Sequence, residues 1–155
     1  MTVEKLIYLA TPYSHPSERT RRSRYAAACR IAGELMAKGH VVFSPIAHSH
    51  GIACEVAELG LDFEAWAHQD LAMLGRCDLL VVVPMDGYLQ SVGIAFEVEA
   101  ATQKGLPVKV LTTTPDGTPG LFRQPMSDEL RAWAFARHAA EASRQPGDAH
   151  GREDG

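Results

Sequence analysis

The chain has 155 residues, of which 46% are hydrophobic and 22% charged, and its formal net charge is −4. This composition indicates one water-soluble globular domain with a sizeable core. The negative charge argues against a surface that coats nucleic acid, and no apolar run reaches the roughly 18 residues of a membrane span. Three scattered cysteines without a CxxC spacing favour reduced thiols and a cytoplasmic protein.

The first half of the chain predicts two strands with a helix between them. Residues 6–10 (LIYLA) form a short apolar run that ends at a Thr-Pro pair, which is typical of a buried strand. Residues 16–38 carry apolar side chains at helical spacing, and Gly39 suits the end of that helix. Residues 41–44 (VVFS) predict a second strand, and residues 47–61 a loop with a short helix.

The same alternation continues in the second half. Asp62 is expected to cap a helix over residues 63–75, and the apolar run 79–83 (LLVVV) predicts a strand buried on both faces. A helix over residues 91–104 and a strand over residues 108–111 follow. Together these elements predict an α/β fold with a doubly wound parallel sheet, flavodoxin-like or Rossmann-like, in a single domain.

The rest of the chain predicts a loop, one more helix and a tail. Residues 112–125 are rich in Thr, Pro and Gly and are expected to form a loop. Ser127 is expected to cap a last helix over residues 128–142. The small polar residues 145–155 are expected to be disordered, so that the domain spans residues 1–144.

Polar groups gather where the first and third predicted strands end, and those ends share one edge of the sheet. They are Thr11, Tyr13, Ser14 and His15 after the first strand, and Asp86, Ser91 and Gly93 after the third. Ser91 suits a helix N-cap, which is the simpler interpretation. The alternative is that Ser91 binds an anion together with the unpaired amides of the first helical turn.

Two acids and a tyrosine stand out against their surroundings. Glu97 shares its helix face with small and apolar residues, where burying a carboxylate without a partner or a function is unfavourable. The alternative is structural, since the positive end of the helix dipole also favours an acid near the N-terminus. Asp70 lies on or beside an apolar helix stripe, and could simply pair with His68 or Arg76. Tyr8 lies within the first strand and could be ordinary core.

Histidines and arginines add further candidates. His48-x-His50 could ligate a metal together with Asp70, but no spacing matches a zinc site, so we expect no metal and a hydrogen-bonding or substrate-contacting role for His48. Four arginines crowd the start of the first helix, where most would be solvated and one could reach a phosphate. They are Arg19, Arg21, Arg22 and Arg24.

Over residues 5–111 these motifs resemble the nucleoside 2-deoxyribosyltransferase superfamily. The closer likeness is to its small bacterial and phage branches and to the deoxynucleoside 5′-monophosphate N-glycosidases. The matching pieces are YLATPYS with Tyr8, Asp70, the LLVVV strand, Ser91-x-Gly93 and Glu97. Two departures are a longer loop over residues 84–90, which carries Asp86 and Tyr88, and a changed loop after the first strand.

The resemblance implies a role for four of these residues. Glu97 matches the nucleophile that attacks the anomeric carbon of the sugar, and Tyr8 matches a tyrosine that positions it. Asp70 matches an acid that orients the base or the sugar. Ser91 matches a phosphate-binding serine of the monophosphate glycosidases, which favours a phosphorylated ligand.

The sequence therefore predicts an enzyme that cleaves or exchanges the N-glycosidic bond of a nucleoside or nucleoside 5′-monophosphate, without a cofactor. We expect a homo-oligomer that binds neither nucleic acid nor membranes. One alternative is a nucleotide sensor without catalysis, since a fold does not fix a function. Another is a metal-dependent phosphohydrolase that uses His48, His50 and Asp70.

Overall fold

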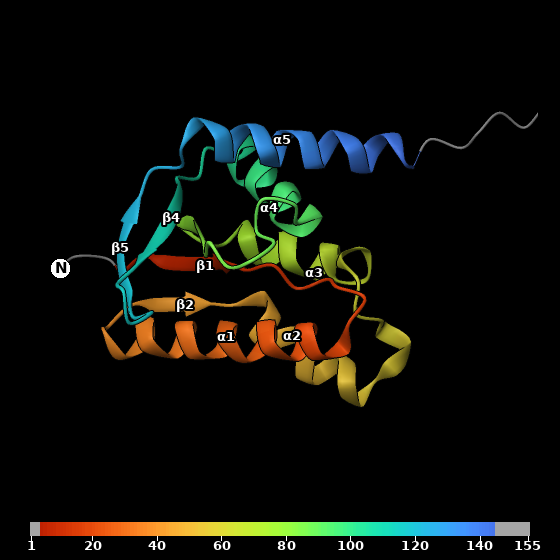
Figure 1. Cartoon of the computed structure of the whole chain (residues 1–155), viewed down its shortest axis with the longest axis horizontal. Helices are drawn as coiled ribbons and strands as arrows, with labels where there is room; N and C mark the ends of the chain where they lie inside the picture. Colours follow the sequence, from red (N-terminus) through yellow and green to blue (C-terminus); the bar gives the residue numbers. More distant parts are fainter. Residues whose placement is uncertain (1–3, 145–155) are drawn as a thin grey trace, which may run out of the picture.

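A five-stranded sheet lies at the centre of the protein, as the computed structural model of residues 4–144 shows (Figure 1). Its strand order is β2-β1-β3-β4-β5, and the first four strands run parallel. The strands are β1 (Leu6–Ala10), β2 (Val41–Phe43), β3 (Leu79–Val82), β4 (Val108–Thr113) and β5 (Pro119–Arg123). This is the flavodoxin-like order, in which the chain leaves β1 and β3 in opposite directions and opens a crevice at their carboxyl ends.

Helices cover both faces of the sheet (Figure 1). They are α1 (Glu18–Ala37), α2 (Pro45–Glu55), α3 (Phe63–Leu74), α4 (Val92–Gln103) and α5 (Ser127–Ala142), with a 3₁₀ turn at Ala57–Leu59. Four of them begin at a side chain that accepts a hydrogen bond from the third amide of its helix, which satisfies one otherwise unpaired donor. These caps are Ser17, Ser44, Asp62 and Ser91.

The core has one layer on each side of the sheet. Ile7, Leu9 and Val81 pack on α1, whereas alternate residues such as Leu80 and Val82 pack on α3, α4 and α5. Successive strand residues point to opposite faces, so a strand covered on both sides must be apolar throughout. The predicted α/β single domain with buried strands is confirmed.

The segment after β4 corrects the expectation of a loop over residues 112–125. It holds the edge strand β5, which pairs antiparallel with β4. Gly117 adopts φ +81° in the connecting turn, which the amide of Thr114 closes by donating to the carbonyl of Thr118 at 2.9 Å. Pro119 is the first residue of β5, a position at an edge where its missing N–H is tolerated.

Two helix starts also differ from expectation. The region 47–61 is mostly helical, because α2 already begins at Pro45, behind its cap Ser44. The cap of α5 is Met126 rather than Ser127, and the Glu129 side chain accepts a hydrogen bond from the Met126 amide at 2.7 Å.

Other sequence predictions concern the ends of the chain, membranes and cysteines. The predicted tail 145–155 lies outside the described residues. Within residues 4–144 no helix is long and apolar enough to cross a membrane. The three cysteines are all unpaired.

Candidate functional site

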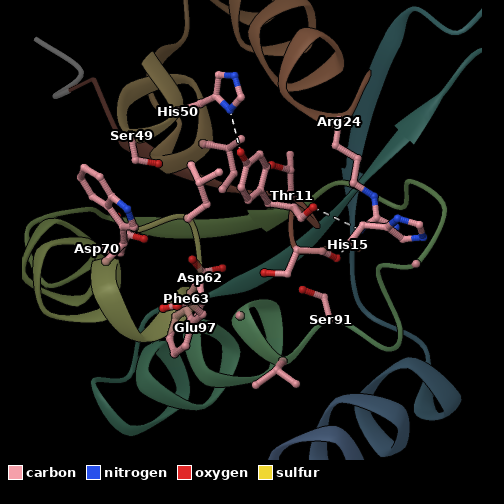
Figure 2. Close-up of a pocket in the computed structure, with 18 of the residues that line it drawn as sticks. Thr11, His15, Arg24, Ser49, His50, Asp62, Phe63, Asp70, Ser91 and Glu97 are labelled. Carbon is pink, nitrogen blue, oxygen red and sulfur yellow. Dashed lines mark hydrogen bonds between the residues drawn. The ribbon is translucent and has the colours of Figure 1, made fainter. Parts of the chain in front are cut away.

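A cavity of about 400 Å³ opens where the loops after β1 and β3 diverge (Figure 2). The loop of residues 11–17 and the loop of residues 83–91 form part of its wall, and α2, α3 and the start of α4 complete it. Since ligands of open α/β sheets bind at this switch point, the position alone makes the cavity the candidate site.

Glu97 lies in the cavity wall, on the second turn of α4, and is 5% exposed. The buried Tyr8 hydroxyl donates a 2.7 Å hydrogen bond to its Oε1. Burial raises the pKa of Glu97 to about 8, the negative charge of Asp70 adds to the rise, and the bond from Tyr8 opposes it. Burial and the nearby carboxylates hold the pKa of Tyr8 well above its ordinary value, so Tyr8 stays a neutral donor.

Asp70, near the end of α3, is the second buried acid of the cavity. Burial raises its pKa to about 6, and its Oδ1 has no hydrogen-bond partner among the described residues. The buried Thr11 Oγ1, also in the cavity wall, has none either. Buried polar atoms are normally paired, so these two atoms in the cavity wall are available to hydrogen-bond a polar ligand or water.

One side of the cavity can hold an anion. Arg24, His15 and Ser91 lie together there (Figure 2). The Arg24 guanidinium donates to the carbonyl oxygens of Tyr13, Ser14 and Asp86 at 3.4, 2.9 and 3.1 Å. No carboxylate pairs with Arg24 among residues 4–144, so its positive charge remains available to a ligand.

The start of α4 adds hydrogen-bond donors to that side. The Ser91 hydroxyl caps the helix by accepting from the Ile94 amide at 3.3 Å, so its predicted structural role is confirmed. The first amides of the helix, at Val92 and Gly93, have no partner within it and carry the positive end of its dipole. Gly93 faces the Phe63 ring, since a Cβ at this position would be in van der Waals contact with it at 3.4 Å.

Flat and apolar side chains line another part of the wall. Phe63 and Trp66 come from α3, Ile46 and Ala53 from α2, and Leu61 from the connection between them. The Trp66 indole N–H donates to the Gly60 carbonyl at 3.0 Å, which fixes the ring. Aromatic faces of this kind suit a planar heterocycle.

A hydrogen-bonded pair of aromatic residues completes the wall near α2. The hydroxyl of Tyr13 lies 2.7 Å from Nδ1 of His50, and the His50 ring stacks on Tyr25 at a centroid distance of 4.1 Å. Burial and the charges of Arg22 and Arg21 lower the pKa of His50. His50 is therefore a neutral, packed part of the wall.

The structure gathers most of the predicted site residues, but not all. Glu97, Asp70, Ser91, Gly93, Thr11, Tyr13 and Ser14 line the cavity, and Tyr8 reaches it through Glu97. His48 is exposed and packs against Phe43, and Asp86 contributes only its carbonyl oxygen, to Arg24. In residues 4–144 no three His, Cys, Asp or Glu side chains form a group that could hold a metal.

Several residues of the cavity wall were not predicted from the sequence. Arg24 was one of four candidate arginines, and only the structure distinguishes it from the others. Phe63 and Trp66 had the spacing of a core-facing helix stripe, and nothing in that spacing separates core from cavity wall. For the His48-x-His50 motif the sequence favours a hydrogen-bonding or substrate-contacting histidine over a metal ligand, and the structure shows such a hydrogen bond at His50, with Tyr13.

Comparison with known proteins gives a family and several similar solved structures. The family model described as "Domain of unknown function (DUF1937)" matches residues 5–113. No curated protein matches the chain. A solved structure of a 2-deoxyribosyltransferase from the psychrotolerant bacterium Bacillus psychrosaccharolyticus is 26% identical, covers 68% of this chain and 70% of its own, and gives a TM-score of 0.48.

Proposed function

This chain belongs to the DUF1937 family of unknown function, and we propose that it cleaves or exchanges the N-glycosidic bond of a nucleoside, preferably a nucleoside 5′-monophosphate. The observation that carries the proposal is the buried Glu97, held by the Tyr8 hydroxyl beside the second acid Asp70. This pair of acids lies in a cavity with an arginine on one side and aromatic rings on another.

The proposed reaction uses Glu97 as the nucleophile. Its Oε1 is engaged by Tyr8, so Oε2 is the oxygen that forms a bond to the anomeric carbon. The bond from that carbon to the base nitrogen breaks, its electron pair stays on the nitrogen, and a proton from Asp70 neutralises the leaving base. Water then attacks the same carbon, the bond to Oε2 of Glu97 breaks, and the proton of the water returns to Asp70, which releases the sugar and restores the carboxylate of Glu97. A second base that attacks in place of water gives up its proton to Asp70 in the same way and completes a transfer.

The two carboxyl groups need one proton between them for this reaction. Glu97 must be ionised to attack, and Asp70 must be protonated to donate. Their pKa values of about 8 and about 6 leave the pair with one proton near neutral pH. Because the two groups interact, that proton belongs to the pair, and a bound sugar that develops positive charge favours ionised Glu97.

The anion-binding side supplies positioning rather than chemistry. Arg24, the Ser91 hydroxyl and the first amides of α4 offer a positive charge and hydrogen-bond donors to a 5′-phosphate. Binding a phosphate away from the reacting carbon holds the sugar over Glu97, which lowers the entropic part of the barrier. The base would then lie between Phe63 and Trp66 on one side and Tyr13 on the other.

Release of free base tests the proposal. Wild type and Glu97→Gln are incubated with the common nucleosides and their 5′-monophosphates, with and without an acceptor base, and the products are separated by chromatography. We expect base from the wild type and a loss on the order of 10³-fold or more in Glu97→Gln. Glu99→Gln is the matched control, because Glu99 lies on the same helix outside the cavity, half-buried and paired with Arg137 of α5. Undiminished activity of Glu97→Gln would disprove the mechanism.

A nucleotide sensor remains the second candidate function, and one observation favours it. With a pKa of about 8, Glu97 is mostly neutral at pH 7, which suits a hydrogen-bonding wall residue as well as a resting nucleophile. A sensor would bind nucleotides equally well in wild type and Glu97→Gln and release no base from any of them.

A further inference from the structure

The loop of residues 84–90 is fastened to the C-terminal part of the chain by side chains that the proposed reaction does not use. The Tyr88 hydroxyl donates to Oε1 of Glu129 at 2.9 Å, and the Trp133 indole N–H donates to the carbonyl of Tyr88 at 3.2 Å. Glu129 and Trp133 both belong to α5, which lies beside α4 in Figure 1.

Glu129 is an unusual anchor because it is a carboxylate with 1% exposure. Its two oxygens accept from both terminal nitrogens of Arg123, at 2.6 and 2.8 Å, and from the amide of Met126 at 2.7 Å. These bonds hold the pKa of Glu129 down at about 2, so the carboxylate is charged at every working pH. A hydroxyl that donates to such a fixed charge makes a strong and directional bond.

The other end of the same loop contributes directly to the cavity. Gly87 and Gln90 line it, and the loop runs into Ser91 and the first turn of α4. Arg24 ties the loop to the opposite wall through the carbonyl of Asp86, and Gly87 adopts φ +86° where a Cβ would lie 2.5 Å from the Arg24 guanidinium. The loop is therefore fixed at two points, one in the cavity and one on α5.

We propose that Tyr88 is a positioning residue: its bond to Glu129 sets the loop so that Arg24 and Ser91 together fit a 5′-phosphate. This inference rests on the proposed function. The β5–α5 segment follows the family match, which ends at residue 113. Through Glu129 this segment would help the cavity to select phosphorylated over unphosphorylated nucleosides. Tyr88 itself is not among the residues that line the cavity.

Tyr88→Phe tests the inference, because it removes one hydroxyl and keeps the ring that packs at 6.3 Å from Trp133. We expect KM, or Kd if no turnover occurs, to rise about tenfold for a nucleoside 5′-monophosphate. The KM or Kd for the corresponding nucleoside should stay within about twofold of wild type, and so should kcat for both substrates. A merely structural role would instead lower activity on both substrates together. Glu141→Gln, which removes an exposed ion pair of α5, is the control.

Hydrogen exchange of the backbone amides tests whether Tyr88 holds the loop, independently of whether the protein catalyses the proposed reaction. We expect faster exchange over residues 87–91 in Tyr88→Phe than in wild type or Glu141→Gln, with unchanged exchange in β1 and β3. Equal exchange, or equal preference for the monophosphate, would overturn the role of Tyr88. If wild type neither binds nor cleaves any nucleotide, the proposed function fails, while the exchange comparison still decides whether Tyr88 holds the loop.

Discussion

At the scale of single residues, the protein places two acids where water reaches them poorly, and it leaves one oxygen of Asp70 unpaired among the described residues. Burying a carboxyl group raises its pKa because the charged form loses solvation. A carboxyl group kept neutral by burial destabilises the fold as soon as it is forced to ionise. Function at this site is therefore linked to a measurable dependence of stability on pH.

The first prediction concerns that dependence. The pKa of Glu97 is about 8 in the folded protein against an ordinary 4.5, so the folded state holds a proton that the unfolded state has lost between these values. Stability should therefore fall as pH rises from 5 to 8, by up to about 1.4 kcal/mol per pH unit. Urea unfolding of wild type, Glu97→Gln and Glu99→Gln measures it. Only Glu97→Gln should show a clearly shallower fall of the free energy of unfolding with pH. The same fall in all three proteins would refute the prediction that Glu97 is buried in its neutral form.

A second prediction concerns the rate. If the active form holds one proton on the pair, kcat/KM should rise up to about pH 6 and fall above about pH 8. Asp70→Asn removes the acid but keeps the nucleophile, so its lower remaining activity should only rise with pH. Steady-state rates across pH 5 to 9 measure both profiles. A fall at high pH in Asp70→Asn would show that another group donates the proton.

At the scale of elements, the cavity depends on how two loops are joined. The loops after β1 and β3 come from different crossovers, and Arg24 on α1 bonds carbonyl oxygens of both. The Arg24 guanidinium that would bind a phosphate therefore also joins the two loops that form the cavity walls. A helix side chain can do this because the strand order brings the ends of β1 and β3 together.

A third prediction follows for Arg24. Arg24→Gln keeps hydrogen-bond donors but loses the charge, so the preference for a nucleoside 5′-monophosphate over the nucleoside should drop about tenfold or more. Isothermal titration with both ligands measures this preference. Arg19→Gln, at an exposed position of the same helix, should leave the preference unchanged. If Arg24→Gln keeps the wild-type preference for the monophosphate, the phosphate does not bind at Arg24.

The elements also show what the sequence can and cannot predict. The strands β1 and β3 and the caps Asp62 and Ser91 were predicted correctly, because burial on both faces and capping leave local patterns. The strand β5 was missed, since a short edge strand that begins with Pro119 and Gly120 resembles a loop. The cavity wall was predicted only in part: Phe63 looks like any core residue, and the role of Arg24 depends on contacts between distant loops.

At the scale of the whole molecule, α5 closes one face of the sheet and leaves part of itself uncovered. Trp133 is buried and bonds to the loop after β3, so it is not available to a partner. Phe135, two residues later, is 75% exposed, and it lies beside a shallow apolar hollow that α5 forms with Leu89 and Val92. Exposed aromatic side chains on an apolar surface are typical of interfaces.

The fourth prediction is that the chain forms a homo-oligomer through this face of α5. Light scattering coupled to size exclusion should give a mass above that of one chain, and Phe135→Glu should reduce it to the monomer without changing the far-UV spectrum. Leu121→Glu, on β5 and 81% exposed, is the control for a general effect of added charge. A monomeric wild type would refute the prediction.

The central claim is that Glu97 forms a covalent bond to the sugar. The most direct measurement is intact-protein mass spectrometry after incubation with a nucleoside 5′-monophosphate whose sugar carries fluorine at C2′, which slows the second step by destabilising positive charge on the sugar. We predict that the wild type gains the mass of the fluorinated sugar phosphate less one water, that peptide mapping places it on Glu97, and that Glu97→Gln gains nothing. A wild type that releases base with no such adduct, or an adduct on another residue, would contradict the account.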